Sequence, residues 1–399
     1  MTGSPPLSSD TPATFSLEEQ LRYARHLSLP EIGAAGQTQL RQASVLVIGA
    51  GGLGSPALLY LAAAGVGRLG IIDPDYIELS NLQRQVLYTT AACGSPKVEE
   101  ARQRLLALNP HLRIDSYPEA FSIDNARELA ASYDVLIEGS DRFATKYLVN
   151  DACVQAGKPY VGASIRAFSG MLAVYAAPGG PCHRCLFPQE PDPDTVPSCA
   201  QAGVLGTVPG LFGLLQAHEA LKLILGIGEP LIGSVLTIDL LAMRFQKLRL
   251  PRDPNCPSCG ESPSIQPLTE SSSACASTAA GSPLHTTLLH PDALPWISLA
   301  DAQQDPSLRW IDIRTSAEFI AGHIPGAAHI PLDQIEQVIA SLKPDSQRLL
   351  LYCQRGARTV QAYFLLKDKL GHRLFLLEGG YETWLHEQYR AARDAPTSR

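Results

Sequence analysis

The sequence lacks a surplus of positive charge. Its 399 residues contain 32 lysines and arginines against 39 aspartates and glutamates, a formal net charge of -7. Because the phosphate backbones of DNA and RNA attract basic surfaces, this balance does not favour a nucleic-acid partner. No block of like charge forms a tail. The hydrophobic fraction of 45% is typical of a globular protein, with enough apolar residues for two cores.

The sequence also lacks an uninterrupted apolar run of about 20 residues, the length that a membrane-spanning helix needs. The most apolar stretch, Val204 to Ile227, is interrupted by Pro209, Glu219 and Lys222, and is interpreted as a buried helix. Residues 1–15 lack a basic segment followed by an apolar one, so they are interpreted as a disordered tail and not a signal peptide. We therefore expect a cytoplasmic protein without a membrane partner.

The cysteines do not form an even set. There are nine of them, in a sequence without a recognisable secretion signal. This favours a reducing compartment, in which cysteines bind metals or carry out chemistry more often than they form disulfides.

Two segments with an alternating strand and helix pattern are separated by a stretch without periodicity. Residues 16–260 carry the first pattern and residues 291–399 the second, while residues 261–290 are small, polar and punctuated by proline. The middle stretch is predicted to be a flexible linker. The alternation predicts an α/β fold in both domains: a larger, Rossmann-like, doubly wound domain, then a smaller one.

Individual elements follow from the hydrophobic periodicity. Ser16 followed by Glu19 is a capping box, which predicts the start of a first helix. Helices are expected over Ser16–Leu27, Lys97–Leu108, Tyr147–Ala156 and Thr359–Lys369, and strands over Leu69–Ile72, Tyr133–Glu138, Tyr160–Ala163, Met171–Ala176, Ser234–Asp239, Trp310–Ile313, Leu349–Tyr352 and Leu374–Leu377.

A glycine-rich turn follows the first predicted strand. Gly49-x-Gly51-x-x-Gly54 opens a helix, and Asp73 ends the next strand, where it is placed to bind a ribose hydroxyl. Such glycines let the backbone approach phosphates, and the helix N-terminus favours their negative charge. The context favours an adenine nucleotide over a turn required only for packing.

Cationic and amide side chains follow this turn. The run Ser80 to Arg84 (SNLQR) comes after Asp73, Lys97 opens the next helix, and Arg22 and Arg25 lie on the first helix. Several cations near a nucleotide suit a triphosphate with a leaving pyrophosphate better than a hydride carrier. Any one of them alone is more often a solvated surface residue.

Two CxxC pairs have the spacing of metal ligands. Cys182 and Cys185 follow a Gly-Gly-Pro turn, and Cys256 and Cys259 enclose a proline. Two such pairs supply four thiolates for one tetrahedral, structural Zn²⁺. The alternatives are four free buried thiols or a single redox CxxC.

Three other cysteines belong to the same domain. Cys93 and Cys153 are predicted to pack as small hydrophobic residues. Cys199 differs because it lies in a Pro- and Gly-rich stretch, where a mobile loop can carry a nucleophile. The alternative for Cys199 is an unreactive loop thiol.

A further cysteine ends a predicted strand of the second domain. Cys353 is followed by a glycine and by Arg355 and Arg358, in a turn that must lead into a helix. The backbone N–H groups of such a turn form an anion-binding nest, and the helix N-terminus adds positive potential. Both stabilise a thiolate or persulfide anion at Cys353.

Together, the glycine turn, Asp73, the SNLQR run, Lys97 and Asp141 resemble the MoeB/ThiF branch of the ubiquitin-activating enzymes, from about Phe15 to Gly260. The resemblance implies the same zinc site, and it implies Mg²⁺ beside Asp141 and a homodimer in which Arg25 reaches the partner's nucleotide. Arg142 stands where the family usually has asparagine. The residues implied to bind ATP are Arg25, Gly52, Asp73, Ser80, Asn81, Leu82, Gln83, Arg84, Lys97, Asp141 and Arg142.

Residues from about Trp296 onward resemble a single rhodanese domain. The segments that carry the resemblance are Trp310–Leu332, Leu349–Thr359 and Leu376–Trp384. It implies that Cys353 carries a persulfide and that the segment with Asp312, Arg314 and Glu318 orders the active-site loop. His323 and His329 are not assigned to catalysis.

The combined resemblance, to molybdopterin-synthase adenylyltransferase/sulfurtransferases, implies ATP-dependent adenylation of the terminal glycine of a ubiquitin-like sulfur carrier ending in Gly-Gly. Sulfur transfer from the Cys353 persulfide then gives a thiocarboxylate, with Cys199, Arg84 and Asp141 as further catalytic residues. Thiosulfate or a cysteine desulfurase would supply sulfur, for molybdenum cofactor, thiamine, tRNA thiolation, cysteine or siderophore synthesis. The alternatives are a nicotinamide-dependent oxidoreductase fused to a sulfurtransferase domain, and a non-catalytic scaffold.

Overall fold

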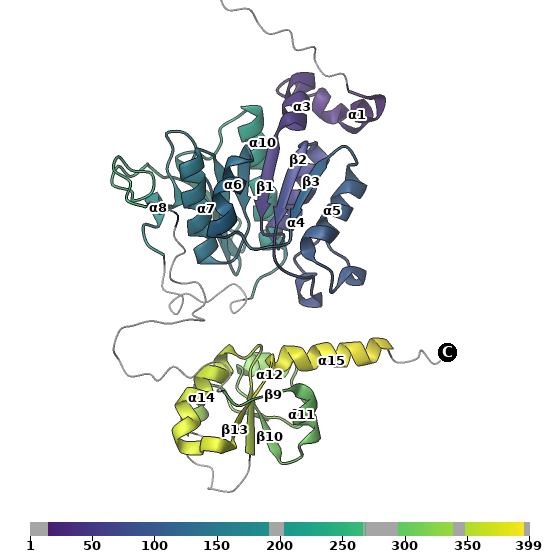
Figure 1. Ribbon diagram of the computed structural model, residues 1–399, viewed down its shortest axis with the longest axis vertical. Helices are drawn as coiled ribbons and strands as arrows, with labels where there is room; N and C mark the ends of the chain where they lie inside the picture. Colours follow the sequence, from purple (N-terminus) through teal and green to yellow (C-terminus); the bar gives the residue numbers. More distant parts are fainter. Residues whose placement is uncertain (1–14, 191–202, 266–267, 269–293, 338–347, 395–399) are drawn as a thin grey trace, which may run out of the picture. The chain divides into compact units, whose positions relative to one another are not determined.

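The computed structural model describes residues 15–190, 203–265, 268, 294–337 and 348–394. The chain divides into two compact units, Met1–Ala279 and Ala280–Arg399, each drawn in Figure 1. The division falls within the predicted linker, while the exact domain boundaries stay a prediction. Among the described residues, no helix is both long and apolar enough to cross a membrane.

The first unit alternates strands and helices along most of its length. Its elements are α1 (Leu17–Arg22), α2 (Ala24–Leu27), α3 (Gly33–Gln42), β1 (Ser44–Ile48), α4 (Gly54–Ala64), β2 (Arg68–Ile72), η1 (Leu79–Asn81), η2 (Thr90–Ala92), α5 (Lys97–Leu108), β3 (Arg113–Tyr117), α6 (Ile123–Ala131), β4 (Val135–Glu138), α7 (Phe143–Ala156), β5 (Tyr160–Arg166), β6 (Ser169–Tyr175), α8 (His183–Leu186), α10 (Thr207–Leu225), β7 (Ser234–Asp239) and β8 (Arg244–Arg249).

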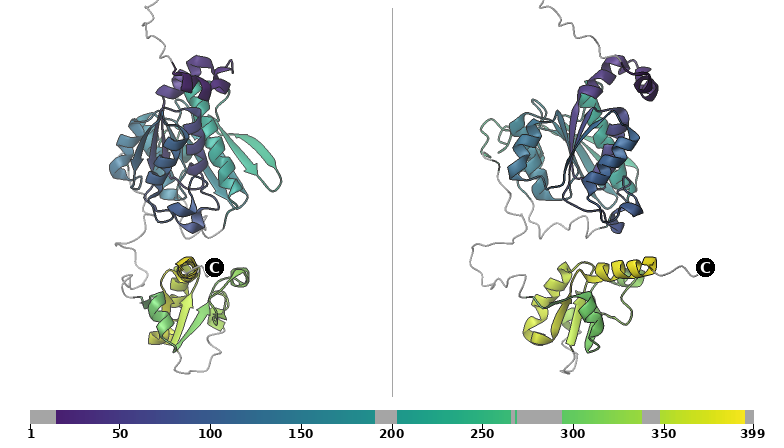
Figure 2. Two further views of the ribbon diagram at one scale, coloured as in Figure 1. Left: turned by 90° about the vertical axis from the view of Figure 1, so that its right-hand side faces the viewer. Right: turned by 45° about the vertical axis from the view of Figure 1, so that its right-hand side comes forward.

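These strands form one eight-stranded sheet in the order β3-β2-β1-β4-β5-β6-β7-β8. Strands β1 to β5 run parallel, and β6 to β8 continue the sheet antiparallel. Figure 2 shows the hairpin of β7 and β8 extending from the body of the unit. The chain reverses its winding at β1, so the adjacent ends of β1 and β4 form the switch point where ligands bind in such folds.

Helices cover both faces of this sheet. Val45 and Val47 of β1 face one core with α4, α5 and α10, whereas Leu46 and Ile48 face a second core with α6 and α7. Successive side chains of a strand point to opposite faces, so a strand buried on both faces is apolar throughout. The doubly wound prediction is confirmed.

The predicted first helix is interrupted. The capping box of Ser16 and Glu19 is present, but the chain turns at Tyr23 and forms two short helices. Tyr23 is buried, and its hydroxyl accepts a hydrogen bond of 2.8 Å from Asn109. The predicted helix is therefore interrupted at one buried residue, Tyr23.

The second unit is a smaller α/β domain. Its elements are β9 (Trp296–Ile297), α11 (Leu299–Gln304), β10 (Leu308–Asp312), α12 (Ser316–Ala321), β11 (Ala328–His329), β12 (Arg348–Tyr352), α14 (Ala357–Leu370), η4 (Gly371–Arg373), β13 (Leu374–Leu377) and α15 (Gly380–Asp394). The sheet has the order β11-β10-β12-β13-β9 and is parallel throughout. Separate cores lie on its two faces, as expected for a domain that folds by itself.

Candidate functional site

The glycine turn lies at the carboxyl ends of the parallel strands. Gly49 follows β1 with φ +90°, and a Cβ there would lie 3.0 Å from the carbonyl oxygen of Gly139, which follows β4. A Cβ on Gly54 would lie 1.9 Å from the carbonyl of Gly49. Only glycine fits this close approach, which brings the loops after β1 and β4 together.

Asp73 follows β2 and joins this turn. Its carboxylate accepts hydrogen bonds from the backbone of Ala50 at 2.8 Å and of Asp75 at 2.9 Å. The side chain is 6% exposed, and burial raises its pKa while Lys97, 3.7 Å away, acts in the opposite direction. The structure therefore brings Asp73 and Lys97 together beside the glycine turn, as predicted.

Lys97 opens α5 and is itself buried. Its ammonium lies 2.7 Å from the carboxylate of Asp75, whose side chain is largely exposed. A phosphate approaching Lys97 would therefore compete with Asp75 for the same ammonium group.

The run from Ser80 to Arg84 forms η1 and the turn after it. Arg84 donates to the carbonyl of Ser80 at 3.0 Å, and Asn81 accepts from the backbone of Glu78 at 3.2 Å. A Cβ on Gly52 would lie 3.4 Å from the side chain of Arg84, so Arg84 reaches the glycine turn. Of the other predicted residues, Leu82 packs against the core and Gln83 is exposed.

Asp141 and Arg142 lie in the exposed turn between β4 and α7. Asp141 is two residues from Gly139, whose backbone N–H donates to the carbonyl of Ile48 at 2.8 Å. The turn with Asp141 is thus held next to the glycine turn by the β1–β4 pairing.

Arg25 is not brought to this site within one chain. It is exposed on α2, and the neighbouring Arg22 donates to the carbonyl of Leu108 at the end of α5. Lys97 begins α5 and Leu108 ends it. The length of this 12-residue helix, about 18 Å, therefore lies between Lys97 and the carbonyl that Arg22 contacts. Figure 1 places α1 and α3 at the opposite end of the sheet.

The structure adds residues that the sequence analysis missed. Tyr88 is buried and donates to the carbonyl of Ala50 at 2.9 Å. Gln85 is 3% exposed beside Gly51, and its side-chain oxygen lacks a hydrogen-bond partner among the described residues. The position of Gln85 directly after the SNLQR run is the only signal for it in the sequence.

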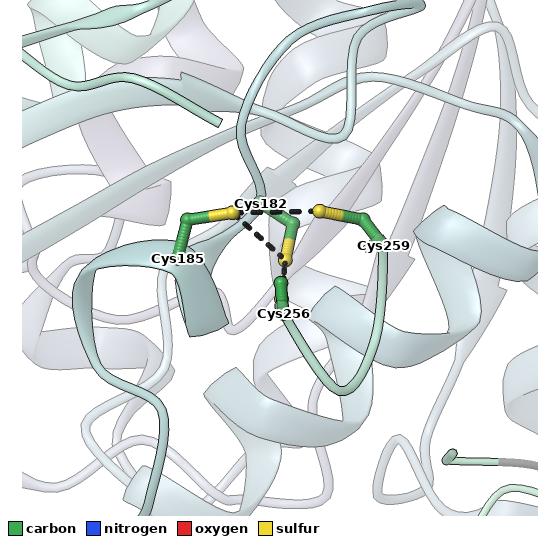
Figure 3. Close-up of side chains that lie close together, drawn as sticks. All are labelled: Cys182, Cys185, Cys256 and Cys259. Carbon is green, nitrogen blue, oxygen red and sulfur yellow. Dashed lines mark hydrogen bonds between the residues drawn. The ribbon is translucent and has the colours of Figure 1, made fainter. Parts of the chain in front are cut away.

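The four cysteines of the two CxxC pairs converge, with their sulfurs pointing toward one another in Figure 3. The sulfur of Cys182 lies 3.5 Å from that of Cys256 and 4.0 Å from that of Cys185, and Cys185 lies 3.4 Å from Cys259. All four lie within 4.8 Å of one another. A tetrahedral Zn²⁺ with Zn–S bonds of about 2.3 Å would place its sulfurs about 3.8 Å apart, so this donor set fits zinc.

One carboxylate of α7 joins both pairs. Asp151 accepts from Arg184 at 2.7 Å, beside the first pair, and from Ser258 at 2.8 Å, within the second. The second pair lies in a turn after β8. The cluster therefore connects three segments that are distant in the sequence.

The remaining cysteines of this unit differ in burial. Cys153 is fully buried and burial raises its thiol pKa, which confirms its packing role. The prediction for Cys93 is wrong: it is exposed, because it follows η2 in a turn on the surface. Cys199 lies outside the described residues, so its role stays a prediction.

Cys353 lies at the end of β12, where the chain turns into α14. The side chain is 2% exposed, and its sulfur accepts a hydrogen bond of 3.1 Å from the backbone N–H of Gly356. Gly356 has φ +113°, a conformation that glycine adopts far more readily than other residues. The backbone N–H of Gly356 is therefore one donor of the predicted anion nest.

The segment with Asp312, Arg314 and Glu318 was predicted to order the loop after Cys353, and it contacts that loop. Arg314 is 2% exposed, pairs with Asp312 at 2.7 Å and donates to the side chain of Gln354 at 3.1 Å. Glu318 accepts two hydrogen bonds, of 2.8 and 2.6 Å, from Arg358. The Nε2 of His329 donates to the carbonyl of Arg314 at 2.9 Å.

The two arginines of the loop are both paired. Arg358 binds Glu318, and Arg355 binds Glu382 of α15 with one contact of 3.0 Å. Since Tyr381 also donates from its backbone to the carbonyl of Cys353 at 2.8 Å, the start of α15 closes the loop on its other side. The loop is less cationic than its two arginines suggest.

Family models match both units. The model described as the ThiF family matches residues 23–258, and the rhodanese-like domain model matches residues 297–387. Together they cover most of the described chain.

Curated relatives match the first unit alone or most of the chain. A sulfur carrier protein adenylyltransferase of Thermus thermophilus is 50% identical over 65% of this chain and 98% of its own length. The adenylyltransferase and sulfurtransferase MOCS3 of Mus musculus is 44% identical over 85% of this chain and 73% of its own. The probable adenylyltransferase/sulfurtransferase MoeZ of Mycobacterium tuberculosis is 40% identical over 96% of this chain and 97% of its own.

Solved structures agree in fold. The crystal structure of E. coli MccB with ATP matches with a TM-score of 0.51 and 26% identity, over 60% of this chain and 74% of that chain. None of these relatives supports the alternative of a nicotinamide-dependent oxidoreductase.

Proposed function

The chain belongs to the ThiF family and, with its rhodanese-like domain, is an adenylyltransferase and sulfurtransferase, and we propose that it acts on a ubiquitin-like sulfur carrier protein ending in Gly-Gly. The observation that carries this proposal is the presence of two features in one chain: a glycine turn at the carboxyl ends of parallel strands, with Asp73 and Lys97 beside it, and a strand-end cysteine whose sulfur accepts a hydrogen bond from a backbone N–H. Adenylation activates a carboxylate, and a persulfide on the second unit consumes the activated acyl group.

The nucleotide site is proposed to consist of the residues at the carboxyl ends of β1, β2 and β4. Asp73 would bind the ribose, and Arg84 and Lys97 would bind phosphates as point charges and hydrogen-bond donors. Asp141 offers a carboxylate to a Mg²⁺ that would neutralise phosphate charge. The full set proposed for ATP is Gly52, Asp73, Ser80, Asn81, Leu82, Gln83, Arg84, Lys97, Asp141 and Arg142, with Arg25 supplied by the second copy in a homodimer.

Adenylation makes a poor electrophile reactive. A terminal carboxylate oxygen of the carrier attacks the α-phosphorus of ATP, and pyrophosphate leaves. Arg84 and Lys97 stabilise the charge that develops on the phosphates, since fixed cations in a partly buried site act most strongly on the transition state. The product is a mixed anhydride of the carrier's carboxyl group and AMP.

Sulfur transfer uses this anhydride. The terminal sulfur of the Cys353 persulfide attacks the acyl carbon and AMP leaves, which gives an acyl disulfide between the carrier and Cys353. The thiolate of Cys199 attacks the Cys353 sulfur, releases the thiocarboxylate and leaves a Cys199–Cys353 disulfide, which a cellular thiol must reduce. In an alternative sequence, Cys199 attacks the anhydride first.

The donor and pathway belong to the same proposal. Thiosulfate or a cysteine desulfurase would supply the sulfur of Cys353, in the cytoplasm, for molybdenum cofactor synthesis or a related carrier pathway. The positive charge of Arg358 beside Cys353 would suit thiosulfate, but its pairing with Glu318 compensates this charge. We therefore favour a protein-borne persulfide.

The test is exchange of labelled pyrophosphate into ATP. The protein should catalyse exchange only when a carrier ending in Gly-Gly is present, and a carrier shortened by its last glycine should give none. Exchange that is independent of the carrier, or its absence with every sulfur carrier tested, would contradict the proposed substrate.

A further inference from the structure

A buried ion pair lies next to the turn that carries Asp141. Glu138 is the last residue of β4 and is 1% exposed, and Lys146 lies on α7 and is 8% exposed. The ammonium of Lys146 donates to the carboxylate of Glu138 and, at 2.8 Å, to the carbonyl of Ala163 in β5. Neither side chain has a role in the nucleotide binding, adenylation or sulfur transfer proposed above.

The carboxylate of Glu138, which Lys146 fixes in place, holds the start of this turn. The second carboxylate oxygen of Glu138 accepts from the backbone N–H of Ser140 at 2.8 Å and from the Ser140 hydroxyl. At the other end, the turn leads into α7, whose first backbone hydrogen bond runs from the N–H of Lys146 to the carbonyl of Arg142 at 3.2 Å, independently of the Lys146 side chain. Asp141 lies between these two attachments.

The pair is also fixed against the rest of the site. The backbone carbonyl of Glu138 accepts from Gln216 of α10 at 2.6 Å, and the same amide donates to Val161 of β5 at 3.0 Å. Gly139, the next residue, bonds to the end of β1 beside the glycine turn. Three elements therefore converge on Glu138, at the strand end from which the Asp141 turn begins.

Stability alone is a weak reason for such a pair. Removing two charges from water offsets much of their attraction, so apolar side chains of similar size often stabilise a fold as well. Charge-assisted hydrogen bonds add direction, because each donor and acceptor is fixed in place. A rigid shell of this kind is what a catalytic group needs to stay in its productive geometry.

We propose that Glu138 and Lys146 are positioning residues for adenylation, which act through Ser140 to hold Asp141 toward the nucleotide phosphates and their divalent cation. This inference rests on the proposed nucleotide site. It separates two functions: Asp73, Arg84 and Lys97 bind the nucleotide, and the buried pair orients the group that faces the cation.

The test compares Lys146→Met and Ser140→Ala with the wild type. Pyrophosphate exchange with a Gly-Gly carrier should lose about tenfold or more in kcat for Lys146→Met, since small misplacements of reacting groups cost up to about a hundredfold. The Mg²⁺ concentration for half-maximal rate should rise, while KM for ATP changes less than about twofold. Ser140→Ala should change kcat and the Mg²⁺ concentration for half-maximal rate in the same direction but by less. Lys146→Arg, which keeps the positive charge, should retain most of the wild-type rate.

A second readout does not depend on turnover. Binding of Mn²⁺ to the full-length protein with a non-hydrolysable ATP analogue, followed by electron paramagnetic resonance, should weaken in Lys146→Met and Ser140→Ala. The matched control is Lys222→Met, which removes a partly buried Lys–Glu pair, with Glu219 on α10, away from the nucleotide edge. It should lower Tm without changing Mn²⁺ binding or the Mg²⁺ dependence.

Unchanged kcat, Mg²⁺ dependence and Mn²⁺ binding in folded Lys146→Met and Ser140→Ala would overturn the positioning role. A wild type that gives no exchange with any carrier would instead contradict the proposed function. In that case Mn²⁺ binding decides the positioning role by itself.

Discussion

Single residues around Cys353 show how charge is distributed over the sulfur site. Three cations lie near the loop, and each has a carboxylate partner: Arg314 with Asp312, Arg355 with Glu382 and Arg358 with Glu318. Arg358 also interacts with the Cys353 thiol, and the sulfur accepts a hydrogen bond from one backbone donor, the N–H of Gly356. Such donors are fixed by the fold and stabilise an anion at any pH.

Replacing the sulfur-bearing residue should separate the two activities. Cys353→Ala removes the persulfide and changes no residue of the nucleotide turn, which belongs to the other unit. Carrier-dependent pyrophosphate exchange should stay within about twofold of wild type, and sulfane sulfur on the protein should disappear in a cyanolysis assay. Loss of exchange together with sulfur would show that the two sites are not independent.

The pairing of Glu318 predicts a pH-dependent stability. The hydrogen bonds from Arg358 lower the pKa of Glu318 from 4.5 to about 2, so its contribution is present above pH 4.5 and is lost as the pH falls toward 2. Glu318→Gln should lose about 1 kcal/mol at pH 7, the upper range for a partly exposed pair.

Chemical denaturation at several pH values checks this. The difference in unfolding free energy between wild type and Glu318→Gln should shrink between pH 4.5 and pH 2. A difference that stays constant over this range would mean that the ion pair does not stabilise the fold.

Residues of this kind mark the limit of prediction from sequence. The glycine turn, Asp73 and the CxxC pairs could be read directly, because local spacing fixes their geometry. The partners of Arg355 and Arg358 could not, since Glu382 and Glu318 lie 27 and 40 positions away. Glu138 and Lys146 were missed for a related reason: a buried charge has no local signal that separates it from an exposed one.

At the scale of elements, the hydrophobic pattern predicted most of the buried strands and the helices α5, α7, α10 and α14. It did not predict the strands β3, β8, β9 and β11 or the helices α3, α6, α8, α11, α12 and α15. Strand β8, for example, is exposed along its whole length and therefore lacks an apolar run. Strands such as β1 and β4 are buried on both faces and therefore read as short apolar runs. The pattern failed at Tyr23, where a tertiary contact divides the helix, and at Cys93, where a turn places a small thiol on the surface.

The cysteine cluster links elements that otherwise have little reason to meet. Cys185 lies in α8, Cys259 lies in the turn after β8, and Asp151 of α7 contacts Arg184 and Ser258 of the two pairs. Removing Zn²⁺ with a strong chelator, or making Cys185→Ser, should destabilise the first unit by more than about 3 kcal/mol, because structural zinc contributes directly to folding free energy.

Thermal unfolding and metal analysis check this prediction. Cys93→Ser is the control, because that thiol is exposed and far from the cluster in sequence. One zinc per wild-type chain, and less than that in Cys185→Ser, is the expected metal content. Equal stability of the chelated and untreated protein would rule out a structural metal here.

At the scale of the whole molecule, the two units have separate cores and are joined by a long connecting segment. Tethering raises the effective concentration of one site for the other. A protein cleaved at a protease site inserted within residues 269–290 should keep pyrophosphate exchange, while thiocarboxylate formation falls at dilute enzyme. Adding excess second unit should restore it. Equal rates for cleaved and intact protein at dilute concentration would show that tethering has no kinetic role.

The central claim is that acyl activation and persulfide chemistry act in sequence on one carrier terminus. Mass spectrometry of a Gly-Gly carrier after incubation with the protein, ATP and a persulfide donor tests it most directly. The account predicts a mass gain equal to the exchange of one oxygen for sulfur, dependent on ATP and lost in Cys353→Ala. An unchanged carrier mass with wild type, or the same gain with Cys353→Ala, would contradict it.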